Sequence, residues 1–172
     1  MIPESHIYIP VCLQRKLCIP FSSVPNFGQV EDHLLQAVSN DMDGRCIAEG
    51  FVKPGSCVLR SYSIGTFSAG NIRFDLNVEC MMCCPKEGAV IKCTAKTVTQ
   101  AGIRAHAACT VPSPVVVYIS REMHDATRLG EQTQQMPMDS IKPGDAIHIR
   151  VIGRRFELND KQVSIIGELI MI

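Results

Sequence analysis

The sequence predicts an α+β protein in two parts: an antiparallel sheet with one helix at about residues 1–85, and a five-stranded β-barrel at about residues 86–172. Three observations predict it. Apolar residues recur at helical spacing in one segment near the start of the chain. In most later segments they alternate with polar residues, which is typical of half-buried strands. The alternation is interrupted at Pro85–Gly88, which predicts the boundary between the two parts.

The first part begins with a strand and a helix. Residues His6–Leu13 have strand-forming content, and a Pro-rich connection follows at Pro20–Pro25. We expect a helix over Asn26–Val38, with Asn26 as its candidate N-cap, and this unit ends at Asp43–Gly44. The apolar face of the helix would consist of Phe27, Val30, Leu34, Leu35 and Val38.

An antiparallel meander follows the helix. Its strands are expected at Cys46–Val52, Cys57–Ile64 and Ile72–Cys80, the last with nearly strict apolar and polar alternation. The turn chemistry of Lys53–Gly55 separates the first two strands, and the small-residue loop Gly65–Gly70 separates the last two. The first part is therefore expected to read strand, helix and then three neighbouring strands.

Five strand-like segments make up the second part, at residues 89–98, 103–109, 115–119, 146–153 and 163–169. The polar stretch Ser120–Ser140, between the third and fourth segments, predicts a long loop with a short helix. Five strands with a long connection at this point follow the plan of the OB-fold barrel.

Composition and charge give little direct indication of function. The chain has 172 residues, of which 46% are hydrophobic and 20% charged, and it has no Trp, so the core must be mainly aliphatic. The net charge is zero, which gives no bulk sign of a nucleic-acid binder. The first 85 residues carry 6 basic and 8 acidic side chains and the remainder 11 and 9, so the second part is mildly positive.

The nine cysteines are an odd number, which does not suit a secreted disulfide scaffold. The chain opens without the basic start and apolar run of a signal peptide, and no apolar stretch approaches the roughly 18 residues of a spanning helix. We therefore expect a soluble, intracellular protein in a reducing compartment, with the cysteines acting as small hydrophobic residues and no contact with a membrane.

The spacing of Cys80 and Cys83 resembles one half of a zinc site, but no second pair accompanies it. On a strand, side chains at i and i+3 point to opposite faces, which favours packing over a metal site. No nucleophile elbow, phosphate-binding glycine loop or HExxH motif is present. We therefore expect no catalytic residues, no metal and no cofactor.

The order and spacing of several short segments resemble the RNA polymerase stalk subunit family, the seventh subunit in eukaryotic nomenclature and the E-prime subunit in archaea. No single motif is diagnostic, and the resemblance covers nearly the whole chain. The chain could be a viral member of this family, from a large DNA virus that carries its own polymerase. The matching segments are Gly44-Arg45-Cys46, Ile72–Leu76, Pro85–Val90, Val98–Ile103, Val151–Gly153 and Ile165–Leu169.

The resemblance implies a non-catalytic subunit with two roles. An N-terminal tip domain, residues 1–85, would dock on the polymerase core near the clamp, through the loop Ser63–Asn71. The candidate docking residues are Ile64, Gly65, Phe67 and Gly70. The alternative for this loop is a plain hairpin turn whose Phe67 folds back onto the sheet. The implied partners are core subunits, nascent RNA and, in some members, a small helical subunit. The location would be the nucleus of a cell, or the host cytoplasm or virion for a virus.

The OB-fold domain, residues 86–172, would lie along the RNA exit path. Alternation places Lys92, Thr94 and Lys96 on one strand face, although a solvated charged face is the simpler interpretation. The second and third barrel strands carry only His106 and Tyr118 as stacking side chains, which favours contacts to phosphates. The candidate RNA-binding residues are Lys92, Lys96, Arg104, His106, Arg121, Arg150, Arg154 and Arg155.

Two alternatives stay open at this point. The first is a free-standing OB-fold RNA-binding protein of translation or RNA decay, which would not need a sheet that fills the first half of the chain. The second is a small enzyme with a β-barrel core, which would need a polar cluster in a pocket that the sequence does not predict.

Overall fold

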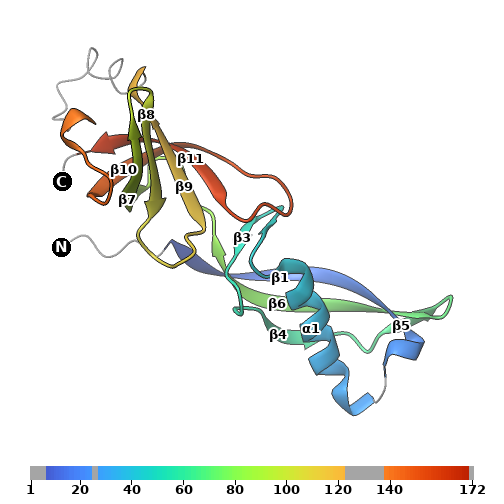
Figure 1. Cartoon of the computed structure of the whole chain (residues 1–172). Helices are drawn as coiled ribbons and strands as arrows, with labels where there is room; N and C mark the ends of the chain where they lie inside the picture. The colour runs from blue at the N-terminus through green and yellow to red at the C-terminus, as the bar shows by residue number, and fades with distance from the viewer. Residues whose placement is uncertain (1–6, 25–26, 123–137, 171–172) are drawn as a thin grey trace.

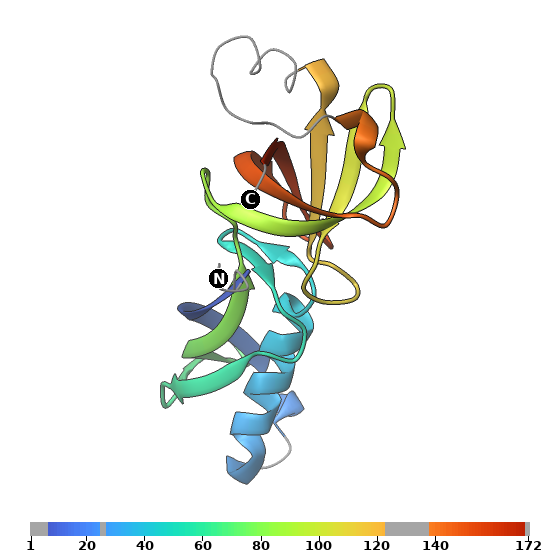
Figure 2. The ribbon, with the colours of Figure 1, turned by 90° about the vertical axis from the view of Figure 1, so that its left-hand side faces the viewer.

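The computed structural model describes residues 7–24, 27–122 and 138–170. This part of the chain forms an antiparallel sheet with a helix, followed by a closed five-stranded barrel, so the predicted α+β fold class is confirmed. Figures 1 and 2 show the sheet and helix at one end of the molecule and the barrel at the other. None of the described helices is long and apolar enough to cross a membrane.

One long strand, β6 (Asn71–Cys83), organises the sheet. On one side it pairs with all 13 residues of β1 (Tyr8–Pro20), which is longer than the predicted strand. Along its other side β6 pairs in turn with three short strands. These are β5 (Thr66–Ser68), β4 (Val58–Tyr62) and β3 (Gly50–Val52), and β2 (Cys46–Ile47) pairs with β3.

The helix α1 (Val30–Met42) packs its apolar stripe against the sheet core. The buried positions recur every four residues, at Val30, Leu34, Val38 and Met42. The start of the helix differs from the prediction. Its N-cap is Gln29, without a side-chain hydrogen bond, and Phe27–Gln29 form a 3₁₀ turn before it, whereas Asn26 lies outside the described residues.

Two predicted segments of the meander are different in the structure. The expected strand Cys46–Val52 is a tight hairpin of β2 and β3, because the chain turns at Ala48–Glu49. Gly50 follows this turn with φ +149°, and a Cβ there would lie 3.0 Å from the Cys83 carbonyl oxygen. The expected loop Gly65–Gly70 contains the short strand β5, which pairs with β6. The small residues of this segment predicted a loop, so nothing in the sequence indicated this pairing.

The barrel has the connectivity of the OB fold. Its strands pair in the order β10-β11-β9-β8-β7, and β7 closes the barrel by pairing with β10. All pairs are antiparallel except that of β9 with β11. The strands are β7 (Val90–Thr99), β8 (Gly102–Ala107), β9 (Val115–Ser120), β10 (Ala146–Arg155) and β11 (Val163–Ile170). The predicted long loop with a short helix falls largely on residues 123–137, outside the described residues.

Part of the sheet packs into the apolar core of the barrel. Cys46, Phe51 and Cys83 of the sheet belong to the same buried cluster as the barrel interior. The β10–β11 loop also bonds to the sheet, since the Cys46 amide donates to the Asp160 carbonyl at 2.7 Å. The Asn159 amide donates to the Cys46 carbonyl at 2.9 Å. These contacts fix the position of the barrel relative to the sheet.

The cysteines divide into buried and exposed groups. Cys46, Cys57, Cys80, Cys83 and Cys93 are buried, as the packing interpretation predicts. Burial raises the pKa of the Cys93 thiol to about 12, so this thiol stays protonated at neutral pH. The prediction is wrong for Cys12, Cys18 and Cys109, which are exposed. Cys80 and Cys83 belong to different core clusters, and no described group of three His, Cys, Asp or Glu residues could hold a metal ion.

Candidate docking loop and nucleic-acid interface

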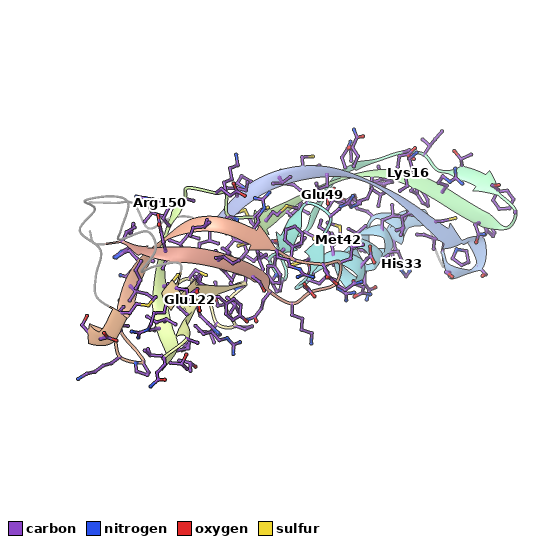
Figure 3. All side chains as sticks on the ribbon, turned by 90° about the horizontal axis from the view of Figure 1, so that it is seen from above. Lys16, His33, Met42, Glu49, Glu122 and Arg150 are labelled. Carbon is purple, nitrogen blue, oxygen red and sulfur yellow. The ribbon has the colours of Figure 1, made fainter. Side chains whose placement is uncertain are left out.

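The residues predicted to be functional lie on two separate surfaces. The candidate docking residues surround β5, at the end of the sheet that lies farthest from the barrel (Figure 1). The candidate RNA-binding residues belong to the barrel strands or lie next to them. Figure 3 shows the same separation, with Arg150 on the barrel and Lys16 of β1 toward the opposite end of the molecule.

The tip of the sheet presents exposed apolar side chains. Ile64 is fully exposed, and Phe67 is 65% exposed. The Phe67 ring packs edge-on against Phe21, with ring centroids 5.9 Å apart. The Phe21 amide donates to the Gly70 carbonyl at 3.0 Å, which ties the end of β1 to this loop. Phe67 therefore does not fold flat onto the sheet, and its role in docking stays a prediction.

Sequence reasoning missed Phe21, which follows Pro20 in the Pro-rich connection. The register of β1 on β6 places it, because Pro20 pairs with Asn71 at the end of the ladder. The available signal in the sequence was an aromatic residue next to a proline, outside any apolar pattern. Without the register, the sequence gives no reason to place Phe21 beside Phe67.

The two glycines of the loop have local structural reasons. Gly65 has φ +85°, and a Cβ there would lie 2.7 Å from a methyl carbon of Ile72. Gly70 has φ +79° at the turn between β5 and β6. Both positions therefore favour glycine whatever the loop contacts. Of the four candidates, Ile64 and Phe67 are the two with side chains that a partner could bind.

On the barrel, the candidate residues Lys96, Arg104 and His106 lie close together on β7 and β8. Thr94 of β7 pairs with His106 of β8, and Arg104 pairs with Thr97, on the other side of a bulge at Lys96. Burial lowers the pKa of His106, and the positive charges of Arg104 and Lys96 lower it further. Lys92 lies farther along the same outer face of β7, as the alternation predicts.

The four other arginines among the RNA-binding candidates already make contacts within the chain. Arg121 pairs with Asp139 at 2.9 Å, Arg150 with Glu168 at 2.8 Å and Arg155 with Glu157 at 3.2 Å. The Arg154 guanidinium donates to the Pro85 carbonyl at 3.0 Å. By contrast, Lys92, Lys96 and Arg104 have no ion pair or hydrogen bond to any side chain in the described ranges. Among the candidate RNA-binding residues, these three could bind a polyanion without displacing a partner in the described part of the chain.

Two hollows flank this cationic group on the outer face of the barrel. One, of about 490 Å³, is lined by residues that include Arg104, Tyr118 and Ile166. The other, of about 590 Å³, is lined by residues that include Lys96 and His106. The first is the more apolar, and its side chains come from β7, β8, β9 and β11. In OB folds this outer face of the second and third strands is where oligonucleotides bind.

Comparison with known proteins gives one informative similarity. No protein-family model matches the chain. A curated protein of Acanthamoeba polyphaga mimivirus is 21% identical to it over 175 residues. The alignment covers 97% of this chain and 84% of the viral protein, which carries the provisional name of a DNA-directed RNA polymerase subunit. The similarity therefore spans both the sheet and the barrel.

Proposed function

We propose that this chain is a non-catalytic stalk subunit of a multisubunit DNA-directed RNA polymerase, and that it docks on the polymerase core and contacts emerging RNA. The observation that carries the polymerase assignment is the similarity to the mimivirus protein over 97% of the chain. It is too distant to carry the finer assignment to the stalk. That part rests on the arrangement of the two surfaces.

The separation of the two surfaces supports a bridging role. An apolar tip at one end and a cationic barrel face at the other could engage the core and a nucleic acid at the same time. The shared core and the hydrogen bonds between Cys46 and the β10–β11 loop would hold the two at a constant distance. We propose residues 1–85 as the docking domain and residues 86–172 as the RNA-binding domain.

The tip suits a docking anchor because its aromatic side chains are already positioned. Phe21 and Phe67 pack on each other, and Ile64, two residues before β5, is fully exposed. Contacts of this kind tend to carry most of the binding energy when a partner pocket buries them. We propose that the anchor consists of these three side chains, with Gly65 and Gly70 shaping the loop.

The barrel face suits contact with phosphates. Within the described residues Lys92, Lys96 and Arg104 have no side-chain partner, and the charges of Lys96 and Arg104 act on His106. Each cation that neutralises a phosphate releases counterions, so RNA affinity should fall as salt rises. Arg121, Arg150, Arg154 and Arg155 stay weaker candidates, since an RNA contact would compete with the contacts that they already make.

The test is affinity capture of the tagged chain from its native source, with mass spectrometry of the recovered proteins. We expect large polymerase subunits, and a small helical subunit where the complex contains one. The variant Ile64→Ser with Phe67→Ser should reduce recovery of the core about tenfold or more. The matched control is Leu158→Ser, which removes an apolar side chain as exposed as Phe67 from the β10–β11 loop. It should recover the core normally.

The contrary results are equally clear. Ribosomal or decay factors without polymerase subunits would overturn the proposal and favour a free-standing OB-fold RNA-binding protein. Polymerase recovery that is unaffected by the double substitution at the tip would retain the polymerase assignment but exclude this loop as the anchor.

A further inference from the structure

A continuous row of side chains crosses the outer face of the barrel. Thr97 of β7 pairs with Arg104 of β8, and Arg104 pairs with Tyr118 of β9. Tyr118 in turn pairs with Ile166 of β11, through the parallel pairing that closes an OB barrel. Four residues that are distant in the sequence therefore stand side by side on one surface.

This row borders the hollow of about 490 Å³. Tyr118 is 46% exposed and Ile166 is 48% exposed, so one face of each is open to the solvent. Gly102 and Ser120 also line the hollow. A side chain at Gly102 would collide with the Ile119 carbonyl, so this position stays without one and the hollow stays open beside Tyr118.

The lining of the hollow is mainly apolar and carries the positive charge of Arg104. Arg104 lines this hollow and Lys96 lines the second one, and the charges of both act on His106. Among the described residues, no acidic side chain lines the hollow. A flat apolar group linked to negative charge is the ligand that fits this combination.

We propose that this hollow binds one unpaired nucleobase of single-stranded RNA, stacked on Tyr118 and packed against Ile166, while Arg104 and Lys96 hold the adjoining phosphates. A duplex would not fit in this way, because its bases are stacked on one another and their faces are covered. The inference rests on the RNA contact of the proposed function and deepens it. It adds a stacking site to a surface that was expected to contact mainly phosphates.

The test is the affinity of the full chain for a labelled, unstructured oligoribonucleotide of about 12 nucleotides, within the site size of an OB fold. Tyr118→Thr removes the ring but keeps a good strand former, and it should weaken binding about tenfold. Tyr118→Phe keeps the ring and should bind within about twofold of the wild type. Thermal unfolding of each variant checks that the barrel remains folded.

Salt dependence separates stacking from charge. Arg104→Gln should reduce the slope of log affinity against log salt by about one, whereas Tyr118→Thr should leave the slope unchanged. A second readout is ultraviolet cross-linking of RNA that contains 4-thiouridine. We expect the cross-linked peptides to include Tyr118 or Ile166, and the yield to fall in Tyr118→Thr.

Three results would overturn the inference. Equal affinity of the wild type and Tyr118→Thr, with cross-links elsewhere, would exclude the base site while leaving the RNA contact intact. Equal losses in Tyr118→Phe and Tyr118→Thr would assign the effect to the hydroxyl group and not to the ring. Absence of RNA binding by the wild type, with polymerase subunits still captured, would remove the RNA contact and the base site together but retain docking.

Discussion

At the scale of single residues, the partners of a side chain distinguish the functional candidates better than its type does. Arg104 and Arg150 are both arginines on the outer surface of the barrel. Arg150 is held by Glu168 at 2.8 Å, whereas Arg104 has no such partner within the described chain and stands beside Lys96 and His106. The free cation is the better candidate for a phosphate, because binding does not cost it an existing ion pair.

His106 predicts a pH dependence of RNA affinity. Burial and the charges of Arg104 and Lys96 lower its pKa, so it is neutral at pH 7 and gains a proton only as the pH falls. A bound phosphate favours the protonated form, so affinity should rise as the pH drops below about 6.5. Because RNA binding would then be coupled to the uptake of a proton by His106, the affinity should increase by up to about tenfold at low pH.

The measurement is RNA affinity at constant ionic strength from pH 7.5 down to 5.5, for the wild type and for His106→Gln. The variant should lose most of the increase, while His148→Gln, on strand β10, which does not pair with β8, should retain it. A pH profile that is the same in the wild type and in His106→Gln would show that His106 does not contact the RNA.

At the scale of secondary-structure elements, the short strands and the helix depend on burial. The helix α1 has no side-chain N-cap, so packing of its apolar stripe against the sheet must provide most of its stability. Leu34, fully buried at the centre of this stripe, contacts the core formed by β4 and β6.

Leu34→Ala should therefore lower the free energy of unfolding by about 2–5 kcal/mol, because it leaves a cavity between helix and sheet. The exposed neighbour Gln36→Ala serves as the control and should change the stability by less than about 0.5 kcal/mol. Urea denaturation followed by circular dichroism measures both. A loss below about 1 kcal/mol at Leu34 would mean that the helix contributes little to the stability of the sheet.

At the scale of the whole molecule, the sheet and the barrel are joined where sheet residues enter the apolar core of the barrel. Phe51 of β3 is buried in the cluster that includes the barrel interior, next to Cys46 and Cys83. Backbone hydrogen bonds between Cys46 and residues Asn159 and Asp160 also hold the β10–β11 loop against the sheet. That loop is one of those that OB folds use for ligands, and here it is occupied by the sheet.

Phe51→Ala should destabilise both parts, because the cavity would open between them. We expect a loss of about 3–5 kcal/mol and faster amide hydrogen exchange in the barrel strand β11 as well as in β6. Hydrogen exchange with mass spectrometry measures the two parts separately. Faster exchange confined to β2, β3 and β6 would show that the barrel is stable without the sheet. The exposed Phe67→Ala is the size-matched control.

The pattern of apolar residues alone was sufficient for the order of most elements, although it missed β5 and the turn between β2 and β3. Alternation placed Lys92, Thr94 and Lys96 on the outer face of β7, and helical spacing identified the stripe of α1. The five barrel strands and the long connection between the third and fourth predicted the OB plan, which the structure confirms. Local periodicity is enough for this because it determines which side of an element each side chain faces.

The neighbours of each side chain were decided only by the tertiary structure. The register of β1 on β6 brings Phe21 beside Phe67, and the parallel pairing of β9 with β11 brings Ile166 beside Tyr118. The same folding pairs Arg150 with Glu168 and leaves Arg104 without a side-chain partner among the residues that the structure describes. These contacts join residues far apart in the chain, and their register depends on burying every strand at once, which no local pattern records.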